Sequence, residues 1–167
     1  MQRVISFIVS NQPGVLCRVA GLISRRGFNI DSITVGVTSN PKLSRITIVM
    51  AAEDTVIEQM LKQLDKLLDV KAIMEIPKDR GTARELALIK VHTGASKKGF
   101  MDVVNSMWGK ILDIGEETTT VQLTGTCDQI DENIERLREY GIFEIARTGM
   151  VALESGDTIL YDSSSKS

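Results

Sequence analysis

The sequence is poor in the residues that build catalytic and metal sites. Its 167 residues include one histidine, His92, and two cysteines, Cys17 and Cys127, which lie far apart and outside any C-x-x-C arrangement. One imidazole cannot form a histidine-based metal site alone, and two cysteines cannot form a disulfide framework. We therefore interpret His92 as a surface or loop residue and both cysteines as buried, reduced thiols.

Aromatic residues, long apolar runs and excess charge are also scarce. Aromatic residues make up 4% of the chain, and its formal net charge is −2. RNA-recognition modules need aromatic side chains on their strands and a basic face, so we expect no nucleic-acid partner. No apolar run approaches the roughly 18 residues of a membrane span, and the first residues lack a basic and apolar leader. We expect a cytoplasmic protein without a membrane partner.

Recognisable catalytic motifs are missing as well. The sequence contains neither a G-x-S-x-G elbow nor a G-x-x-x-x-G-K-[ST] phosphate loop. The adjacent acids Glu116 and Glu117 fall at an expected turn, where solvated side chains are a simpler interpretation than a catalytic pair. We predict no catalytic residue, no metal ligand and no cofactor of its own for this chain.

Apolar periodicity predicts the elements of the first half. Alternating or continuous apolar runs predict four strands, and apolar residues at helical spacing predict two helices. The strands are expected at residues 3–10, 28–37, 44–52 and 70–76, and the helices at 15–26 and 55–68. The apolar phase of the second strand slips by one at Asp31 and Ser32, which predicts a β-bulge.

The same order of elements recurs after a linker at residues 77–82. Strands are expected at 84–92, 110–114, 118–126 and 142–153, and helices at 98–108 and 128–140. The fold class predicted is α+β, with two ferredoxin-like βαββαβ domains at residues 1–77 and 78–167. Helices cover only one face of each such sheet. We expect Val4, Ile8, Ile33 and Val49 on the other face of the first sheet, covered by a partner sheet or second subunit.

A short turn, Asn11 to Gly14, joins the first strand to the first helix. The first N–H groups of a helix lack partners within it, and the helix dipole is positive there, so a carboxylate binds favourably. Gly14 has no side chain to keep a ligand from the backbone. The same residues also suit a simple helix cap and tight turn, and both interpretations stay open at this point.

Several stretches resemble a known family. Residues 5–19, which contain Asn11-Gln12-Pro13-Gly14, resemble the beginning of ACT domains. Residues 25–35, 43–48, 58–70, 120–126 and 146–149 are similar to the small regulatory subunits of acetohydroxyacid synthase, also called acetolactate synthase. The Arg-Gly-Phe-Asn-Ile stretch that begins at Arg26 is the most specific part of this resemblance.

The resemblance implies a non-catalytic subunit. The first domain would be an ACT domain that forms a homodimer side by side, and the chain would activate a catalytic large subunit and confer feedback inhibition by valine. Leucine or isoleucine serves as effector in some members of this family. Thiamine diphosphate, Mg²⁺ and FAD would belong to the catalytic subunit. Carried over by position, the effector-binding residues are Asn11, Gly14, Val15, Leu16, Asn29 and Ile30, with Val35 from the other protomer.

Two other classes of function remain as alternatives. One is a free-standing amino-acid sensor that controls transcription or another biosynthetic enzyme, although no helix-turn-helix or basic helix is visible. The other is a small enzyme of ferredoxin-like fold, which the missing nucleophile and acid–base pair disfavour.

Overall fold

The computed structural model describes residues 2–92 and 97–161, which divide into two compact units. The first unit contains the residues up to Ala83 together with those from Met150 onward, and the second runs from Arg84 to Gly149. Residues 150–161, called the return segment below, therefore belong by their contacts to the first unit. A division after residue 77 would place them in the second.

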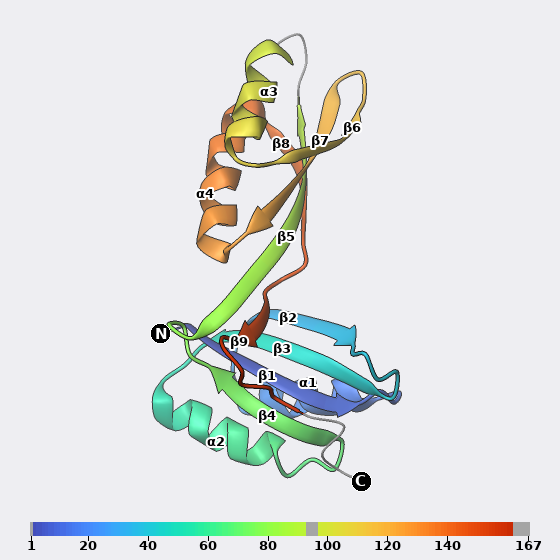
Figure 1. The fold of residues 1–167 in the computed structure, drawn as a ribbon, viewed down its shortest axis with the longest axis vertical. Coiled ribbons are helices and arrows are strands. Elements are labelled where there is room, and N and C mark those ends of the chain that lie inside the picture. Colours follow the sequence, from blue (N-terminus) through green and yellow to red (C-terminus); the bar gives the residue numbers. More distant parts are fainter. Residues whose placement is uncertain (1, 93–96, 162–167) are drawn as a thin grey trace. The chain divides into compact units, whose positions relative to one another are not determined.

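The first unit contains the predicted βαββαβ order, and its α+β fold confirms the prediction. Its elements are β1 (Gln2–Ser10), α1 (Val15–Arg25), β2 (Ile30–Val37), β3 (Leu43–Ala51), α2 (Asp54–Leu64) and β4 (Val70–Ile76). The antiparallel strands lie in the order β2-β3-β1-β4, and both helices cover the same face of the sheet (Figure 1).

The core of this unit lies between the sheet and the two helices. Alternate residues of each strand point to this side, because successive side chains of a strand face opposite ways. Burying each large aliphatic side chain contributes roughly 1.5–3 kcal/mol. The buried cluster consists of Ile5, Phe7, Val9, Val15, Val19, Ile23, Ile46, Ile48, Met50, Ile57, Met60 and Leu64.

The predicted bulge in β2 is confirmed, and it changes the direction of one side chain. The register between β2 and β3 shifts between Ile30 and Ser32, after which Ile33 lies opposite Ile48 of the core. Ile33 therefore faces the helix side, and the expectation that it lies on the open face is wrong. The bulge inserts one residue, and each inserted residue reverses the faces that follow it.

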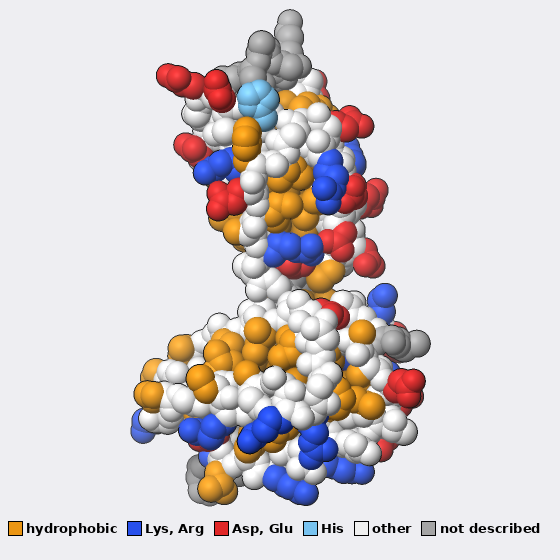
Figure 2. Space-filling view, turned by 180° about the vertical axis from the view of Figure 1, so that it is seen from behind, with side chains coloured by type: hydrophobic (Ala, Val, Ile, Leu, Met, Phe, Trp, Pro, Cys, Tyr) orange, Lys and Arg blue, Asp and Glu red, His pale blue; other side chains and the backbone are white. Residues whose placement is uncertain are grey.

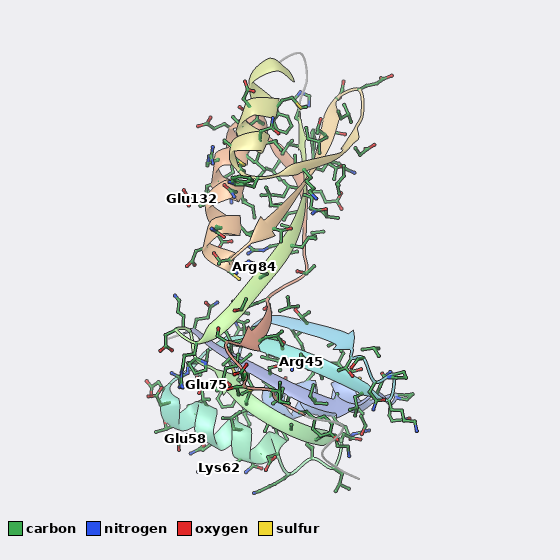
Figure 3. The ribbon with its side chains drawn as sticks, in the orientation of Figure 1. Arg45, Glu58, Lys62, Glu75, Arg84 and Glu132 are labelled. Atoms are coloured by element: carbon green, nitrogen blue, oxygen red, sulfur yellow. The ribbon has the colours of Figure 1, made fainter. Side chains whose placement is uncertain are left out.

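The open face of this sheet is covered in part by the chain itself. Strand β9 (Val151–Glu154) lies against β1 and β4, on the face away from the helices (Figure 1). Ala152 is buried, as are Ile8 and Ile76 of the sheet. Arg45, labelled in Figure 3, donates from Nη1 to the Ala152 carbonyl at 3.2 Å. Ile8 is thus buried within the chain itself, on the strand β1 that β9 contacts.

Helix α2 is shorter than its apolar pattern predicts. It ends at Leu64, although Leu67 and Leu68 continue the helical spacing. The Leu67 N–H donates to the Leu64 carbonyl at 3.0 Å, a tighter turn than that of an α-helix. Leu67 still packs on the core, whereas Leu68 is 92% exposed.

The second unit repeats the same arrangement. Its elements are β5 (Gly81–His92), α3 (Lys97–Ser106), β6 (Lys110–Ile114), β7 (Thr118–Gly125), α4 (Cys127–Leu137), a 3₁₀ turn at Arg138–Tyr140, and β8 (Ile142–Arg147). The strands lie in the order β6-β7-β5-β8. Strand β9 pairs with β5, whose first residues belong to the first unit. The second core contains Ala87, Ile89, Val91, Phe100, Val104, Met107, Val121, Leu123, Ile130, Ile134 and Leu137.

Two side chains near helices are exposed. Helix α3 ends at Ser106, and Trp108 lies beyond it with φ 56° and is 93% exposed. The helix ends where Trp108 adopts this left-handed backbone and the Gly109 N–H donates to the Val104 carbonyl at 3.0 Å. Cys17 is exposed as well, on the outer side of α1, so the expectation of a buried thiol is wrong there.

Candidate functional site

The turn between β1 and α1 has a backbone that suits glycine. Gly14 has φ 83°, in the left-handed region that residues with a Cβ rarely adopt, and occupies the N-cap of α1. No side chain caps this helix, and its first turn contains no acidic residue. Helix ends usually satisfy their first N–H groups with a capping side chain or an acid. The N-terminal end of α1 has neither.

The backbone donors at this end point to a site for an anion. The Val15 N–H reaches the Gln12 carbonyl at 3.3 Å, and the Arg18 N–H begins the helical ladder by donating to the Gly14 carbonyl at 3.0 Å. The N–H groups of Leu16 and Cys17 follow that of Val15 and precede that of Arg18, and the helix itself supplies no acceptor for them. A carboxylate placed there would accept from both and would lie at the positive end of the helix dipole.

Hydrogen bonds fix the turn from two sides. The Asn11 N–H donates to the Lys42 carbonyl at 2.8 Å, and Asn11 Nδ2 donates to the Pro41 carbonyl at 2.9 Å. On the other side, the Ser10 N–H donates to the Asp69 carbonyl at 2.9 Å. These bonds orient the Asn11 amide, and its oxygen accepts no hydrogen bond from the residues that the structure describes. The turn is therefore preorganised, with one acceptor still available.

The other predicted site residues lie on or just before β2. Val35 is opposite Ile46 and, like Leu16 on α1, nearly half exposed. Ile30 is opposite Met50 and packs partly on the core, and Asn29 is exposed just before it.

The register separates Asn29 and Ile30 from the turn within one chain. Ile30 pairs with Met50, which pairs with Arg3 near the start of β1, whereas the turn follows the end of β1 at Ser10. At about 3.4 Å per residue, roughly 24 Å of strand lies between these two ends. The structure thus brings Asn11, Gly14, Val15 and Leu16 together, but it does not bring Asn29 and Ile30 to them. Sequence reasoning could not find this separation, because it depends on the direction of β2.

An ion pair beside the turn also escaped the sequence analysis. Arg18 Nε and Nη2 donate to Asp69 Oδ2 at 2.9 and 2.7 Å. The two residues are far apart in the sequence, and no local pattern pairs them. The pair is partly solvated, with exposed side-chain fractions of 51% for Arg18 and 25% for Asp69.

A second ionic cluster lies in the second unit around the buried acid Glu85. Arg147 Nε and Nη2 bind both oxygens of Glu85 at 2.7 Å, and Arg147 Nη1 binds Asp131 Oδ1 at 2.6 Å. The hydrogen bonds from Arg147 lower the pKa of Glu85 against the opposing effect of its burial. Cys127 Sγ donates to Glu85 Oε2 at 3.2 Å, and burial, aided by this contact, raises the pKa of Cys127 to about 11. All charges of this cluster are paired, so it offers no free group to a ligand.

The described residues show no further chemistry. Within residues 2–92 and 97–161, no three histidine, cysteine or acidic side chains gather as a set of metal ligands. None of the helices that the structure describes is long and apolar enough to cross a membrane. His92 is exposed at the end of β5, where its ring meets Phe143 edge-on at 5.8 Å, which confirms its interpretation as a surface residue.

Comparisons with known proteins cover almost the whole chain. Residues 5–72 match the model of the AHAS small subunit-like ACT domain, and residues 84–156 match that of the small subunit of acetolactate synthase. The acetolactate synthase small subunit of Mycolicibacterium smegmatis is 44% identical over 91% of this chain and 90% of its own length. The isozyme 3 small subunit of Salmonella typhimurium is 40% identical over 96% and 99%.

A solved structure has the same fold over nearly its full length. The crystal structure of the acetolactate synthase small subunit from Thermotoga maritima aligns with a TM-score of 0.88 at 38% identity, covering 95% of this chain and 99% of that one. Identity at this level over whole chains is a property of one family, and it confirms the resemblance found in the sequence. The chain belongs to the acetolactate synthase small subunit family, with an ACT domain in its first half.

Proposed function

We propose that this chain binds valine at the turn between β1 and α1 and through it regulates a separate catalytic subunit of acetolactate synthase, which it also activates. The observation that carries the proposal is the preorganised turn, in which Gly14 leaves the N–H groups of Leu16 and Cys17 accessible. The ligand carboxylate binds these donors, and its ammonium group binds the free oxygen of Asn11. A branched side chain then lies along the apolar residues Leu16 and Val35.

The second part of the proposal is a homodimer that pairs the two β2 strands. Three facts support it. β2 is an edge strand, its residues Ile33, Val35 and Val37 are 37–60% exposed, and such apolar edges pair readily with another strand. Figure 2 shows hydrophobic side chains gathered on the face of the first unit that is turned away from the viewer in Figure 1.

Antiparallel pairing of the two β2 strands also resolves the separation within one chain. A twofold axis between the strands places the beginning of one β2 beside the end of the other. Asn29 and Ile30 of one copy then approach the turn of the second copy, and Val35 stays with its own turn. This proposal differs from the resemblance, which placed Val35 on the other protomer and Asn29 and Ile30 beside their own turn. All seven residues expected at the site serve the same ligand in this arrangement, with two of them donated by the partner.

In the assembled enzyme the division of labour follows from the chemistry of each chain. The condensation of 2-oxo acids and its thiamine diphosphate, Mg²⁺ and FAD belong to the catalytic subunit. This chain contributes a binding site whose occupation changes the conformation or packing of the complex. We place the complex in the cytoplasm.

Two matched variants test the site, Gly14→Asp and Gly14→Asn. Both replacements tolerate a left-handed backbone better than other residues, and both add a Cβ about 3.3 Å from Arg18 Nη1, so they share the same strain. Only aspartate adds an anion where the ligand carboxylate binds. Losing a hydrogen bond to a charged group costs about 1.5–3 kcal/mol, which is roughly a 10- to 150-fold loss of affinity.

The measurements are calorimetric titration with valine and inhibition of the reconstituted enzyme. We expect both variants to activate the catalytic subunit, and valine to bind and inhibit Gly14→Asp at least about tenfold more weakly than Gly14→Asn. Equal valine binding by the two variants would show that the carboxylate lies elsewhere. For the dimer, Val37→Lys places a charge on the edge of β2 and should give a monomer in sedimentation equilibrium.

A further inference from the structure

We propose that Arg18 is a direct ligand of the effector carboxylate and the residue that makes the site select carboxylates over neutral analogues. This inference rests on the proposed effector site and adds a residue that the resemblance did not carry over. The Arg18 guanidinium lies between Asp69 on one side and Gly14 of the turn on the other.

The guanidinium uses only one of its edges within the protein. Nε and Nη2 both donate to Asp69 Oδ2, at 2.9 and 2.7 Å. Among the residues that the structure describes, Nη1 donates to no acceptor. A guanidinium carries five N–H donors in a rigid plane, so fixing one edge also fixes the direction of the remaining N–H groups.

The unused nitrogen lies against Gly14. A Cβ built on Gly14 would be 3.3 Å from Nη1, which places this nitrogen beside the glycine α-carbon. Gly14 precedes the residues whose N–H groups are unpaired. Leu16 and Cys17 are separated from Arg18 by less than one turn of α1, so one carboxylate can accept from their N–H groups and from Nη1 together.

The absence of a side chain on Gly14 therefore has a second consequence besides backbone freedom. Any Cβ would lie 3.3 Å from Nη1, closer than ordinary contact, so the guanidinium would have to shift by a few tenths of an ångström. The same glycine gives the ligand access to the helix N–H groups and to Arg18.

The test compares valine with valinamide, which keeps the ammonium group and side chain but lacks the carboxylate. Calorimetric titrations use the full-length chain as parent, Arg18→Gln, Arg18→Lys and the control Arg25→Gln. Arg25 is an exposed arginine at the other end of α1, where Nε donates to the Gly21 carbonyl at 3.1 Å. Arg18 is half solvated, so we expect Arg18→Gln to weaken valine about three- to tenfold and to leave valinamide unchanged.

The ratio of the two affinities separates ligation from structural support. If Arg18 only supports the structure, its loss weakens the binding of valine and of valinamide equally, and the ratio of their affinities stays that of the parent. That result would overturn the proposal. Arg18→Lys keeps the charge, so its preference for valine over valinamide should fall less than that of Arg18→Gln. Arg25→Gln should keep the preference of the parent. If the parent itself binds no valine, the proposed function fails. If the parent binds valine and Arg18→Gln keeps the ratio, only the role of Arg18 fails.

Discussion

The two units share one strand order and differ in how they treat their polar groups. In the second unit, α4 begins with a capping box, in which Thr126 and Gln129 satisfy each other's backbone N–H groups, and Asp128 lies in the first turn. In the first unit, α1 begins at Gly14 without either device. The same fold thus caps the start of one helix with its own side chains and leaves the start of another without a side-chain cap.

The ion pairs of the two units also differ, in how far each is buried. Arg147 and Glu85 form a two-point pair whose acid is 3% exposed, whereas Arg18 and Asp69 meet in partial contact with water. A buried pair penalises the loss of either partner, and an exposed pair contributes little to stability. We infer that the Arg147–Glu85 pair stabilises the second unit. The Arg18–Asp69 pair, in the first unit, instead holds the Arg18 guanidinium in place for a ligand.

The sharpest test of this contrast is Arg147→Met beside Arg18→Gln. Arg147→Met leaves the Glu85 carboxylate buried without its partner, and we expect the free energy of unfolding to fall by about 3 kcal/mol. Arg18→Gln should lower it by less than about 1 kcal/mol. Urea unfolding of the full chain, followed by circular dichroism, measures both. Equal losses would contradict the contrast, and Glu85→Gln added to Arg147→Met should restore part of the stability.

The cysteines, one in each unit, give the next largest difference. The pKa of Cys127 rises from 9.0 to about 11, which lowers its thiolate fraction near pH 8 roughly a hundredfold. In the native chain we expect iodoacetamide to modify the exposed Cys17 first, and Cys127 about a hundredfold more slowly than an ordinary thiol. Peptide mass spectrometry separates the two sites. Denatured chain is the control, in which both thiols should react alike.

Acid should weaken the second unit through Glu85. Its pKa is lowered in the folded state by the hydrogen bonds from Arg147, so its stabilising effect is present above the unfolded pKa of about 4.3. This effect is lost as the pH falls below that value and through the folded pKa. We expect the stability difference between the parent and Glu85→Gln to shrink over this range in urea titrations. A difference independent of pH from 7 to 3 would show that the carboxylate is not held as an ion.

The smallest effect concerns the capped helix. Thr126→Ala removes the side-chain oxygen that accepts from the Gln129 N–H at 3.3 Å, and we expect a loss of about 1 kcal/mol. Thermal melts measure this change, with Thr124→Ala, an exposed strand threonine, as the control. Valine binding should be unaffected, because this helix end is already satisfied. Altered valine affinity would mean that the two units communicate.

Local patterns predicted much of the fold. The bulge in β2 was visible as a slipped apolar phase at Asp31 and Ser32, and the end of α1 was visible in Gly27, which has φ 73°. The turn at Asn11 to Gly14 was also found, because a glycine at a helix start is a local feature. These features depend on neighbours in the sequence, where periodicity and turn chemistry apply.

Features that depend on distant residues could not be predicted. Nothing in the sequence joins Arg18 to Asp69, or shows that β9 returns to the first sheet to cover Ile8. Both contacts follow from topology, which places segments together only after the strands have paired. The helix expected at 98–108 ends early for a different reason, since Trp108 adopts a left-handed backbone beyond Ser106 although the apolar spacing continues.

The return segment has a consequence for how the chain is made. The strands of the first sheet leave the ribosome before Ala152, which belongs to the β9 strand on their open face and is synthesised only after the whole second unit. At a translation rate of roughly 5–20 residues per second, this face stays exposed for about 4–15 s before β9 is synthesised. A nascent chain interrupted in this interval presents Ile8 and Ile76 to other chains. Translation speed through the second unit therefore sets how long this face of the first sheet stays exposed.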